Sequence, residues 1–345
     1  MNINTSQIKI IITILIILGV GSFWYFINNN INKNSKTDTA SNSLVQSELG
    51  DQAEKKFDFG NKGLKTNTAK LSIPLEKILD GGPGKDGIPA LTNPKFVSVK
   101  EAEKDIAGDI DGMAVSVGSV TKFYPFSIMV WHEIVNDVVN SKPLVITFCP
   151  LCGSSIAFEA EVDGKIEQFG VSGKLYESNL LMYDKSTESL WSQSIGTAVV
   201  GDRTGEKLTI YNSQLMSFKD FSVKWPSGKV LSTDTGYSRN YEFYPYRDYN
   251  DNEDIFFQIS FKDNRLPIKE IMYVVNAYEH SVAFPVKQLD ASVVSVAVGD
   301  NKITATLIDG EVIVKDNSGK ILPGYNEMWF SWATQHQKDG IVWKK

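Results

Sequence analysis

Short β-rich runs, separated by glycine, aspartate and asparagine at roughly ten-residue intervals, follow one another through most of the chain. Runs this short are typical of strands, and hydrophobic residues at 42% of the chain suffice to cover sheets with a core. The pattern predicts a mostly β fold, a sandwich or distorted barrel with minor helices. The expected strands are 115–120, 144–148, 155–158, 165–171, 180–183, 198–200, 208–211, 255–261, 271–277, 293–298, 303–308 and 312–314. The expected helices are 97–104, 125–136 and 216–225.

Two sequence echoes divide this β region into related lobes. Residues 113–126 (MAVSVGSVTKFYPF) resemble 272–286 (MYVVNAYEHSVAFPV), since each reads as a strand, a turn and an aromatic-Pro pair. In a second echo, ring-bearing residues recur with the same separations of three and then four residues. They are Phe218, Phe221 and Trp225 in one copy and Trp329, Trp332 and His336 in the other. We therefore expect a first lobe at 70–240 and a second at 241–345, shortened by about fifty residues.

The N-terminal region differs in character from the rest. After a tail at 1–9, residues 10–27 carry no charge, and as a helix they would span about 27 Å. Trp24 and Tyr25 stand at the far end, where such rings favour the membrane interface. We expect one transmembrane helix that anchors the chain in a membrane, then a disordered polar linker at 28–69. The C-terminal domain is expected on the extracytoplasmic side, although flanking lysines do not decide orientation.

Charge excludes one class of partner. The net charge is −6, and the lysines and arginines are scattered among more numerous acids. Because nucleic-acid binding needs clustered basic residues to neutralise phosphates, we expect no nucleic-acid partner. A protein or small-molecule partner is left open by the sequence.

The only two cysteines, Cys149 and Cys152, stand three apart in Cys-Pro-Leu-Cys-Gly. By the chain-entropy model, a disulfide closing so short a loop contributes only about 2 kcal/mol to the stability of the fold. The pair is therefore a weak structural cross-link. A β-rich run precedes it and another follows Gly153, which predicts a strand-turn-strand site in place of the helix start used by thioredoxin-like proteins. Thiol-disulfide chemistry on another scaffold is one interpretation.

A metal knuckle is the second interpretation of this pair. Such turns normally need a second cysteine pair, so other residues would complete the site. His132 and Met182 are the candidates beside Cys149 and Cys152. Two thiolates with an imidazole and a thioether would suit copper or zinc. The third interpretation is a fixed, inert disulfide or two small core residues.

Two polar segments offer candidate ligand-binding residues. Asp184 and Glu188 could act as a carboxylate pair, with an aromatic platform and an amide beside them, on a glycan-binding surface. The alternative is hairpin-turn chemistry with a core tryptophan. A later tyrosine-rich loop could bind a ligand or cap an edge. The candidates are Asp184, Glu188, Trp191, Gln193, Asp234, Tyr237 and Arg239.

Several motifs in order resemble the family catalogued as domain of unknown function 3179. They are WHEIVND at 131–137, TFCPLCG at 147–153, GVSGKLY at 170–176, MYD at 182–184, ESLWSQ at 188–193 and LSTDTGYSR at 231–239. The resemblance implies no activity, because the family has none assigned. This chain has Trp225-Pro226 where His-Pro is common in the family.

The sequence thus favours a membrane-anchored extracytoplasmic protein whose first lobe carries a Cys-x-x-Cys site of redox or metal-binding character. The alternative is a non-catalytic ligand-binding or structural envelope domain with a fixed disulfide. A stable disulfide that resists mild reductant, without bound metal, would favour that alternative.

Overall fold

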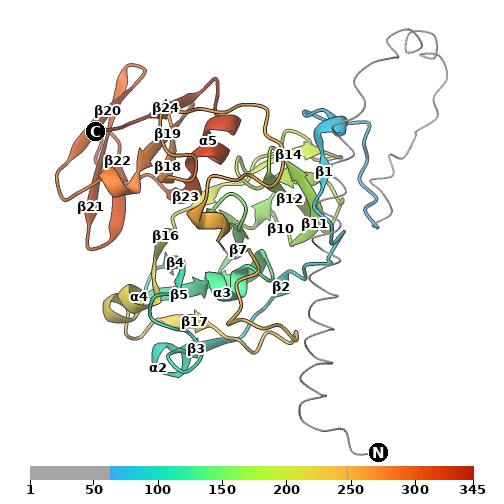
Figure 1. Ribbon diagram of the computed structural model, residues 1–345, viewed down its shortest axis with the longest axis horizontal. Coiled ribbons are helices and arrows are strands. Elements are labelled where there is room, and N and C mark those ends of the chain that lie inside the picture. The colour runs from blue at the N-terminus through green and yellow to red at the C-terminus, as the bar shows by residue number, and fades with distance from the viewer. Residues whose placement is uncertain (1–62, 247) are drawn as a thin grey trace, which may run out of the picture. The chain divides into compact units, whose positions relative to one another are not determined.

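Several open β-sheets carry the fold, as Figure 1 shows for the computed structural model, which describes residues 63–246 and 248–345. The mostly β class with minor helices is confirmed. Within these residues none of the sheets closes into a barrel. The predicted distorted barrel is therefore wrong. The tail 1–9, the predicted membrane helix 10–27 and most of the linker lie outside the described residues. Among the residues that are described, no helix is long and apolar enough to cross a membrane.

The largest sheet in the described chain has nine strands and runs β2-β6-β7-β8-β23-β18-β19-β24, with β15 also on β8. Its bounds are β2 (Leu91–Thr92), β6 (Ile134–Val139), β7 (Lys142–Cys149), β8 (Ser154–Glu159), β15 (Ile210–Tyr211), β18 (Ile271–Ala277), β19 (His280–Pro285), β23 (Gly324–Met328) and β24 (Gly340–Val342). One pairing, Asn326 opposite Ser155, joins two strands that are far apart in the sequence. That junction lies next to the cysteine turn.

Two five-stranded sheets and two small ones complete the described fold, together with short helices. One sheet has β1 (Leu79–Asp80), β11 (Phe169–Tyr176), β12 (Asn179–Asp184), β13 (Leu190–Ser192) and β14 (Thr197–Val200). The other has β16 (Gln214–Ser217), β4 (Asp111–Val117), β5 (Val120–Pro125), β17 (Lys229–Leu231) and β3 (Phe96–Ser98). The small sheets are β9 (Glu161–Val162) with β10 (Lys165–Ile166), and β20 (Val294–Val298), β21 (Asn301–Ile308) and β22 (Glu311–Lys315). The helices are α2 (Val99–Ala102), α3 (Phe126–Met129), α4 (Phe218–Lys224) and α5 (Trp329–Gln335), with single 3-10 turns η1 (Leu75–Lys77), η2 (Tyr249–Asp251) and η3 (Val286–Gln288).

One strand arrangement occurs twice. β16-β4-β5-β17 and β23-β18-β19-β24 have the same order, with two antiparallel pairings followed by a parallel one. A short helix follows the first strand of each, α4 after β16 and α5 after β23. The segments inserted between the hairpin and this strand differ. The first copy inserts β6 to β15, which include the cysteine turn, and the second inserts β20 to β22.

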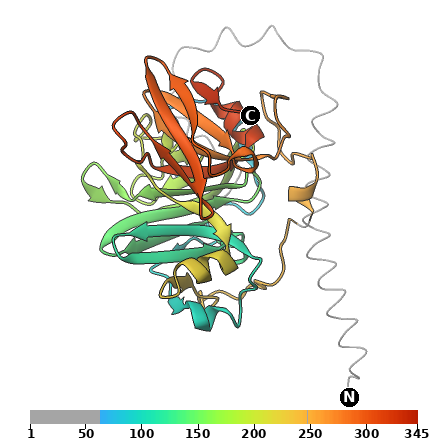
Figure 2. The same cartoon turned by 90° about the vertical axis from the view of Figure 1, so that its left-hand side faces the viewer.

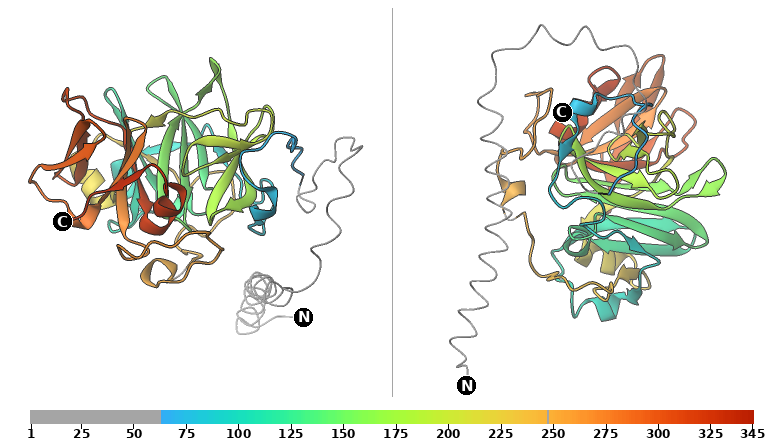
Figure 3. Two further views of the ribbon diagram at one scale, coloured as in Figure 1. Left: turned by 90° about the horizontal axis from the view of Figure 1, so that it is seen from above. Right: turned by 90° about the vertical axis from the view of Figure 1, so that its right-hand side faces the viewer.

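The long segment between β17 and β18 has no strand in its described part and only the η2 turn. We call residues 232–246 and 248–270 the strap. Figure 2 and the left view of Figure 3 show this yellow-orange segment passing outside the sheets. Tyr246, Ile255, Phe257 and Ile259 of the strap pack on the core cluster that contains both cysteines. The strap therefore covers one side of the cysteine turn.

Several predicted elements differ from the structure. The predicted strand 165–171 is divided between β10 and β11, and the predicted helix 216–225 begins only at Phe218, after the end of β16. The predicted strand 255–261 lies in the strap, where alternate residues face the core but no neighbouring strand is available for pairing. The predicted helix 125–136 ends after one turn, because Glu133 takes a left-handed backbone conformation with φ of 57° and Ile134 starts β6. The run 115–120 is broken by the turn between β4 and β5 at Gly118, whose φ is also 57°.

Candidate functional site

The cysteine turn connects β7 to β8. Cys149 ends β7 and pairs with Ser154, the first residue of β8, while the Cys152 amide donates to the Cys149 carbonyl at 3.1 Å. Gly153 has a φ of 54°, and a Cβ there would lie 2.8 Å from Cγ of Met328. Glycine is therefore required both by the backbone conformation and by the close approach of β23. The predicted strand-turn-strand setting is confirmed.

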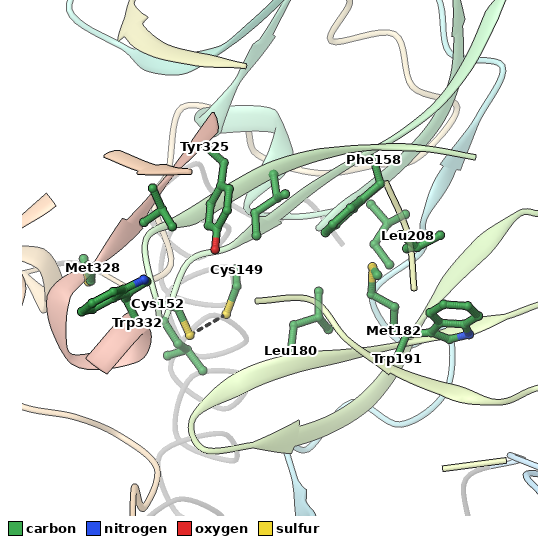
Figure 4. Close-up of a cluster of buried hydrophobic side chains, with 14 of the residues drawn as sticks. Cys149, Cys152, Phe158, Leu180, Met182, Trp191, Leu208, Tyr325, Met328 and Trp332 are labelled. Carbon is green, nitrogen blue, oxygen red and sulfur yellow. Dashed lines mark hydrogen bonds between the residues drawn. The ribbon is translucent and has the colours of Figure 1, made fainter. Parts of the chain in front are cut away.

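The two sulfurs lie side by side without a bond. Cys149 Sγ is 3.2 Å from Cys152 Sγ, and both cysteines are free (Figure 4). A disulfide would bring them to about 2.05 Å. The Cys152 thiol also donates to the backbone carbonyl of Ser178 at 3.0 Å. The structure thus holds a reduced dithiol, which differs from the fixed disulfide of the alternative interpretation.

Burial controls the chemistry of the dithiol. Cys149 is 2% exposed and Cys152 is fully buried. Burial raises the pKa of Cys152 well above its usual value, the adjoining Cys149 adds to the rise, and the Ser331 hydroxyl opposes it. Cys152 is therefore a protonated thiol at neutral pH, and it needs a proton acceptor before it can act as a thiolate.

A buried carboxyl group stands beside Cys152. Glu327 is fully buried in β23, and the amide of the next residue, Met328, donates to the Cys152 carbonyl at 2.9 Å. Oε1 of Glu327 accepts hydrogen bonds from the hydroxyls of Ser194 and Ser331, each at 2.6 Å. Oε2 is buried without a partner. Burial raises the pKa of Glu327, which favours its protonated form.

Glu133 is a second buried acid near the end of β7. Its carbonyl accepts from the Phe148 amide at 2.8 Å, which places it beside the residue before Cys149. Burial raises the pKa of Glu133 to about 8. Burial also raises the pKa of Tyr246, with further contributions from Glu133 and Cys149. A non-glycine residue with positive φ and a raised pKa is a feature often found at functional sites.

We expect Glu133→Gln to change the pH dependence of stability. The folded-state pKa of about 8 lies above the ordinary 4.5, so this group stabilises the fold fully below pH 4.5 and that stability is lost as pH rises through 8. The wild-type chain should lose a few kcal/mol across this window that the variant keeps. Urea unfolding of the full chain at pH 5 and pH 9 measures this difference. Exposed Glu253→Gln is the control, and parallel pH curves for Glu133→Gln and wild type would contradict the expectation.

The structure brings together only the two cysteines among the four candidate metal ligands. His132 is buried. Its Nδ1 is hydrogen-bonded to the Pro89 carbonyl and its Nε2 to the Tyr241 hydroxyl, each at 2.8 Å. Met182 lies beside Trp191 in Figure 4, with Leu180 between it and the cysteines. Among the residues described, no group of three or more His, Cys, Asp and Glu side chains is arranged to hold a metal ion.

The first set of ligand candidates is engaged within the fold. Asp184 is buried and accepts hydrogen bonds from the Trp191 indole at 2.8 Å and from the Thr187 amide at 2.7 Å. Glu188 pairs with Lys85 at 2.6 Å. Gln193 is buried in a hydroxyl and amide network that reaches Ser154 at 2.7 Å. These contacts are those of a hairpin turn packed on a core tryptophan.

The second set lies on the strap. Asp234 pairs with Lys95 at 2.6 Å on the surface, and Arg239 donates to the neighbouring Ser238 carbonyl. Tyr237 is 45% exposed and its ring centroid lies 5.5 Å from that of His132. These three residues remain accessible, and their role in ligand binding stays a prediction.

Sequence reasoning missed Glu327, Ser331 and Ser194. The second echo did place Trp329 and Trp332 at equivalent positions to Phe218 and Phe221, so it located the α5 segment. It carried no signal that this segment adjoins the cysteines, because the contact depends on the pairing of β23 with β8.

Comparison with known proteins identifies relatives only at the level of a family model. Residues 85–321 match the model described as "Protein of unknown function (DUF3179)". No curated protein and no solved structure matches the chain.

Proposed function

We propose that this chain, which belongs to the DUF3179 family of proteins of unknown function, is a thiol-disulfide redox protein. Cys149 and Cys152 are its redox pair. The observation that carries this proposal is the 3.2 Å separation of two unbonded sulfurs in one tight turn. A disulfide can form there by a small approach of the sulfurs, without the large backbone movement that distant cysteines require.

The reaction consumes one disulfide of a partner molecule. The Cys149 thiolate attacks one partner sulfur, a mixed disulfide forms, and the other partner sulfur leaves as a thiolate. Cys152 then loses its proton and attacks Cys149 Sγ, which releases the second partner thiolate. The protein dithiol loses two electrons and two protons, and the partner disulfide gains the two electrons. Cys149 is assigned the first attack because Cys152 is the more deeply buried thiol.

We also propose that residues 10–27 anchor the chain in a membrane with the dithiol domain on the extracytoplasmic side. Eighteen uncharged residues and the interface-type Trp24 and Tyr25 support this. An oxidising compartment is where protein disulfides exchange and persist. Retention of the full chain in membranes washed with alkaline carbonate tests the anchor, and release into the supernatant would contradict it.

The repeated strand arrangement supports a further part of this proposal, that two related lobes make up the domain. The first lobe, 70–240, contributes the cysteine turn, and the second, 241–345, contributes β23 and α5 to the other side of the site. At the positions of Glu327 and Ser331 the first lobe has Met216 and Asp220, judged by the alignment of Phe218 with Trp329. The first lobe therefore has neither a glutamate nor a serine at these two equivalent positions.

Thiol counting with metal analysis on anaerobically purified full-length protein tests the redox proposal. We expect two thiols after reduction, none after mild oxidation, and no stoichiometric metal in either state. Stoichiometric copper or zinc held by the thiols would favour the metal knuckle instead.

A further inference from the structure

The middle of the strap, residues 249–260, contacts the cysteine turn directly. The Tyr249 side chain is fully buried, and its hydroxyl donates to the Leu151 carbonyl at 2.8 Å. Leu151 lies between the two cysteines in the sequence, so this hydrogen bond holds the backbone that positions both sulfurs. A change in the geometry of the cysteine turn therefore acts on the strap without an intermediate.

A second contact joins the strap to the turn between β11 and β12. Ser260 of the strap donates its amide hydrogen to Oε2 of Glu177 at 2.6 Å. The next residue, Ser178, accepts a hydrogen bond from the Cys152 thiol through its backbone carbonyl at 3.0 Å. The turn formed by Glu177 and Ser178, which we call the acceptor turn, thus contacts both the strap and a redox thiol.

The acceptor turn has a backbone conformation that its residue types do not favour. Glu177 has a φ of 52° and Ser178 a φ of 62°, and the flanking Tyr176 pairs with Asn179, as in a two-residue type I′ hairpin. Asparagine and glycine suit that turn, whereas other residues adopt it at a cost in free energy. Among the residues described, the buried Ser178 hydroxyl has no hydrogen-bond partner. The contacts with the thiol and with the strap therefore help to hold this turn in place.

Oxidation of the dithiol changes both contacts. When Cys149 and Cys152 reduce a partner disulfide, two protons and two electrons leave the thiols and one S–S bond forms between them. The Cys152 sulfur then has no proton to donate, so the Ser178 carbonyl loses this hydrogen bond. The sulfurs also approach from 3.2 Å to about 2.05 Å, and the cysteine turn that carries Leu151 must adjust.

We propose that the strap is a redox-sensitive lid, closed over the dithiol and released when Cys149 and Cys152 form their disulfide. The inference rests on the proposed redox function and concerns the regulation of that same site. The moving part is 249–260, which carries both contacts described above. Its release uncovers the disulfide, while its closure shields the thiols.

The two ends of the strap stay in place, because their contacts involve neither the cysteine turn nor the acceptor turn. Near one end, the Tyr241 hydroxyl is hydrogen-bonded to Nε2 of buried His132 at 2.8 Å. Near the other end, the Ile268 carbonyl accepts from the Phe330 amide of α5 at 3.0 Å. Loss of the thiol protons removes neither contact, so the opening is confined to the middle of the strap.

The lid also raises the reduction potential of the redox pair. A strap that closes on the dithiol but not on the disulfide stabilises the dithiol. Because such coupling is reciprocal, a change that weakens closure shifts the equilibrium toward the disulfide by the same factor. The potential of the pair therefore reports on the contacts of the strap.

Hydrogen exchange measured by mass spectrometry on the full chain, in reducing and in oxidising glutathione buffers, tests the lid. Peptides that cover 249–260, with the hydrogen-bonded Ser260 amide, should exchange about tenfold or more faster in the disulfide form. Peptides that cover α5, with the Phe330 amide, should exchange equally in both forms. Equal exchange of 249–260 in the two forms, after thiol counting shows that the disulfide has formed, would overturn the lid.

The double variant Cys149→Ser with Cys152→Ser controls for the buffers. It forms no disulfide, and the serine hydroxyl at position 152 can still donate to the Ser178 carbonyl. Its 249–260 peptides should exchange at one rate in both buffers. A difference between buffers as large as that of the wild-type chain would show that the dithiol does not control the strap.

Tyr249→Phe tests the reciprocal effect on the reduction potential. Loss of the hydroxyl should weaken closure on the dithiol about fivefold, which lowers the potential by about 20 mV. Tyr211→Phe is the matched control, because it removes a tyrosine hydroxyl that donates to the Ser116 carbonyl at 3.0 Å, outside the strap. Its potential should equal that of wild type.

The outcomes separate the lid from the redox function. Equal potentials in Tyr249→Phe and wild type would overturn the lid, as would equal lowering by Tyr249→Phe and Tyr211→Phe. Thiols that persist in every glutathione buffer would overturn the redox function itself, and the lid with it.

Discussion

Replacement of Cys152 with serine is expected to stop disulfide exchange after its first step. Cys149 can still attack a partner disulfide in this variant, but no second thiol stands 3.2 Å away to resolve the product. The hydroxyl of serine does not replace a thiolate in this exchange. The Cys149 mixed disulfide should therefore accumulate, and multiple turnover should fall to the background rate.

Mass spectrometry of the full chain after reaction with glutathione disulfide measures the trapped adduct. Cys152→Ser should carry one glutathione, whereas wild type should lose two hydrogens and carry none. Cys149→Ser is the paired variant, and it should form less adduct because Cys152 is fully buried with a raised pKa. A stable adduct on Cys149→Ser but not on Cys152→Ser would reverse the order of attack assigned above.

Truncation of Tyr249 to alanine is expected to expose the dithiol. The Tyr249 side chain is fully buried, and its hydroxyl donates to the carbonyl of Leu151, within the cysteine turn, at 2.8 Å. Nζ of Lys269 lies 3.5 Å from the centroid of the Tyr249 ring. Loss of a buried aromatic side chain costs about 3–5 kcal/mol, so local opening of the strap should become about a hundredfold or more frequent. Iodoacetamide labelling of the cysteines in the full chain should accelerate by a similar factor.

Two further variants separate the causes of this acceleration. Tyr249→Phe keeps the ring and loses one hydrogen bond worth about 1 kcal/mol, so labelling should accelerate only about fivefold. Phe243→Ala removes a strap side chain that is 44% exposed and should leave the rate unchanged. Equal labelling of Tyr249→Ala and wild type would show that the strap does not control access to the cysteines.

The cysteine turn was predictable from sequence because its information is local. Two β-rich runs flank Cys149 and Cys152, and Gly153 permits the left-handed backbone that closes the turn. The predicted helix at 125–136 failed because Glu133 reverses the chain after one turn, and no residue-type preference signals a glutamate at positive φ. The predicted strand at 255–261 had the right alternation, but pairing requires a free sheet edge, which is a tertiary property.

The rest of the candidate site depends on contacts between distant segments. Glu327 reaches the cysteines only because β23 pairs with β8 through Asn326 and Ser155. Its sequence neighbours resemble any buried strand followed by a short helix. Asp184 and Gln193, which the sequence suggested as ligand-binding residues, instead make buried hydrogen bonds within the fold. Local chemistry alone does not distinguish a buried structural network from a reactive one.

The central claim is that Cys149 and Cys152 interconvert between a dithiol and a disulfide. Equilibration of the full-length protein in a series of glutathione redox buffers, followed by thiol counting, tests it most directly. The account predicts one two-electron transition in which both thiols disappear together. Its potential should lie above about −300 mV, since structural disulfides typically have potentials below that value. Thiols that persist in every buffer, or a disulfide that glutathione does not reduce, would contradict it.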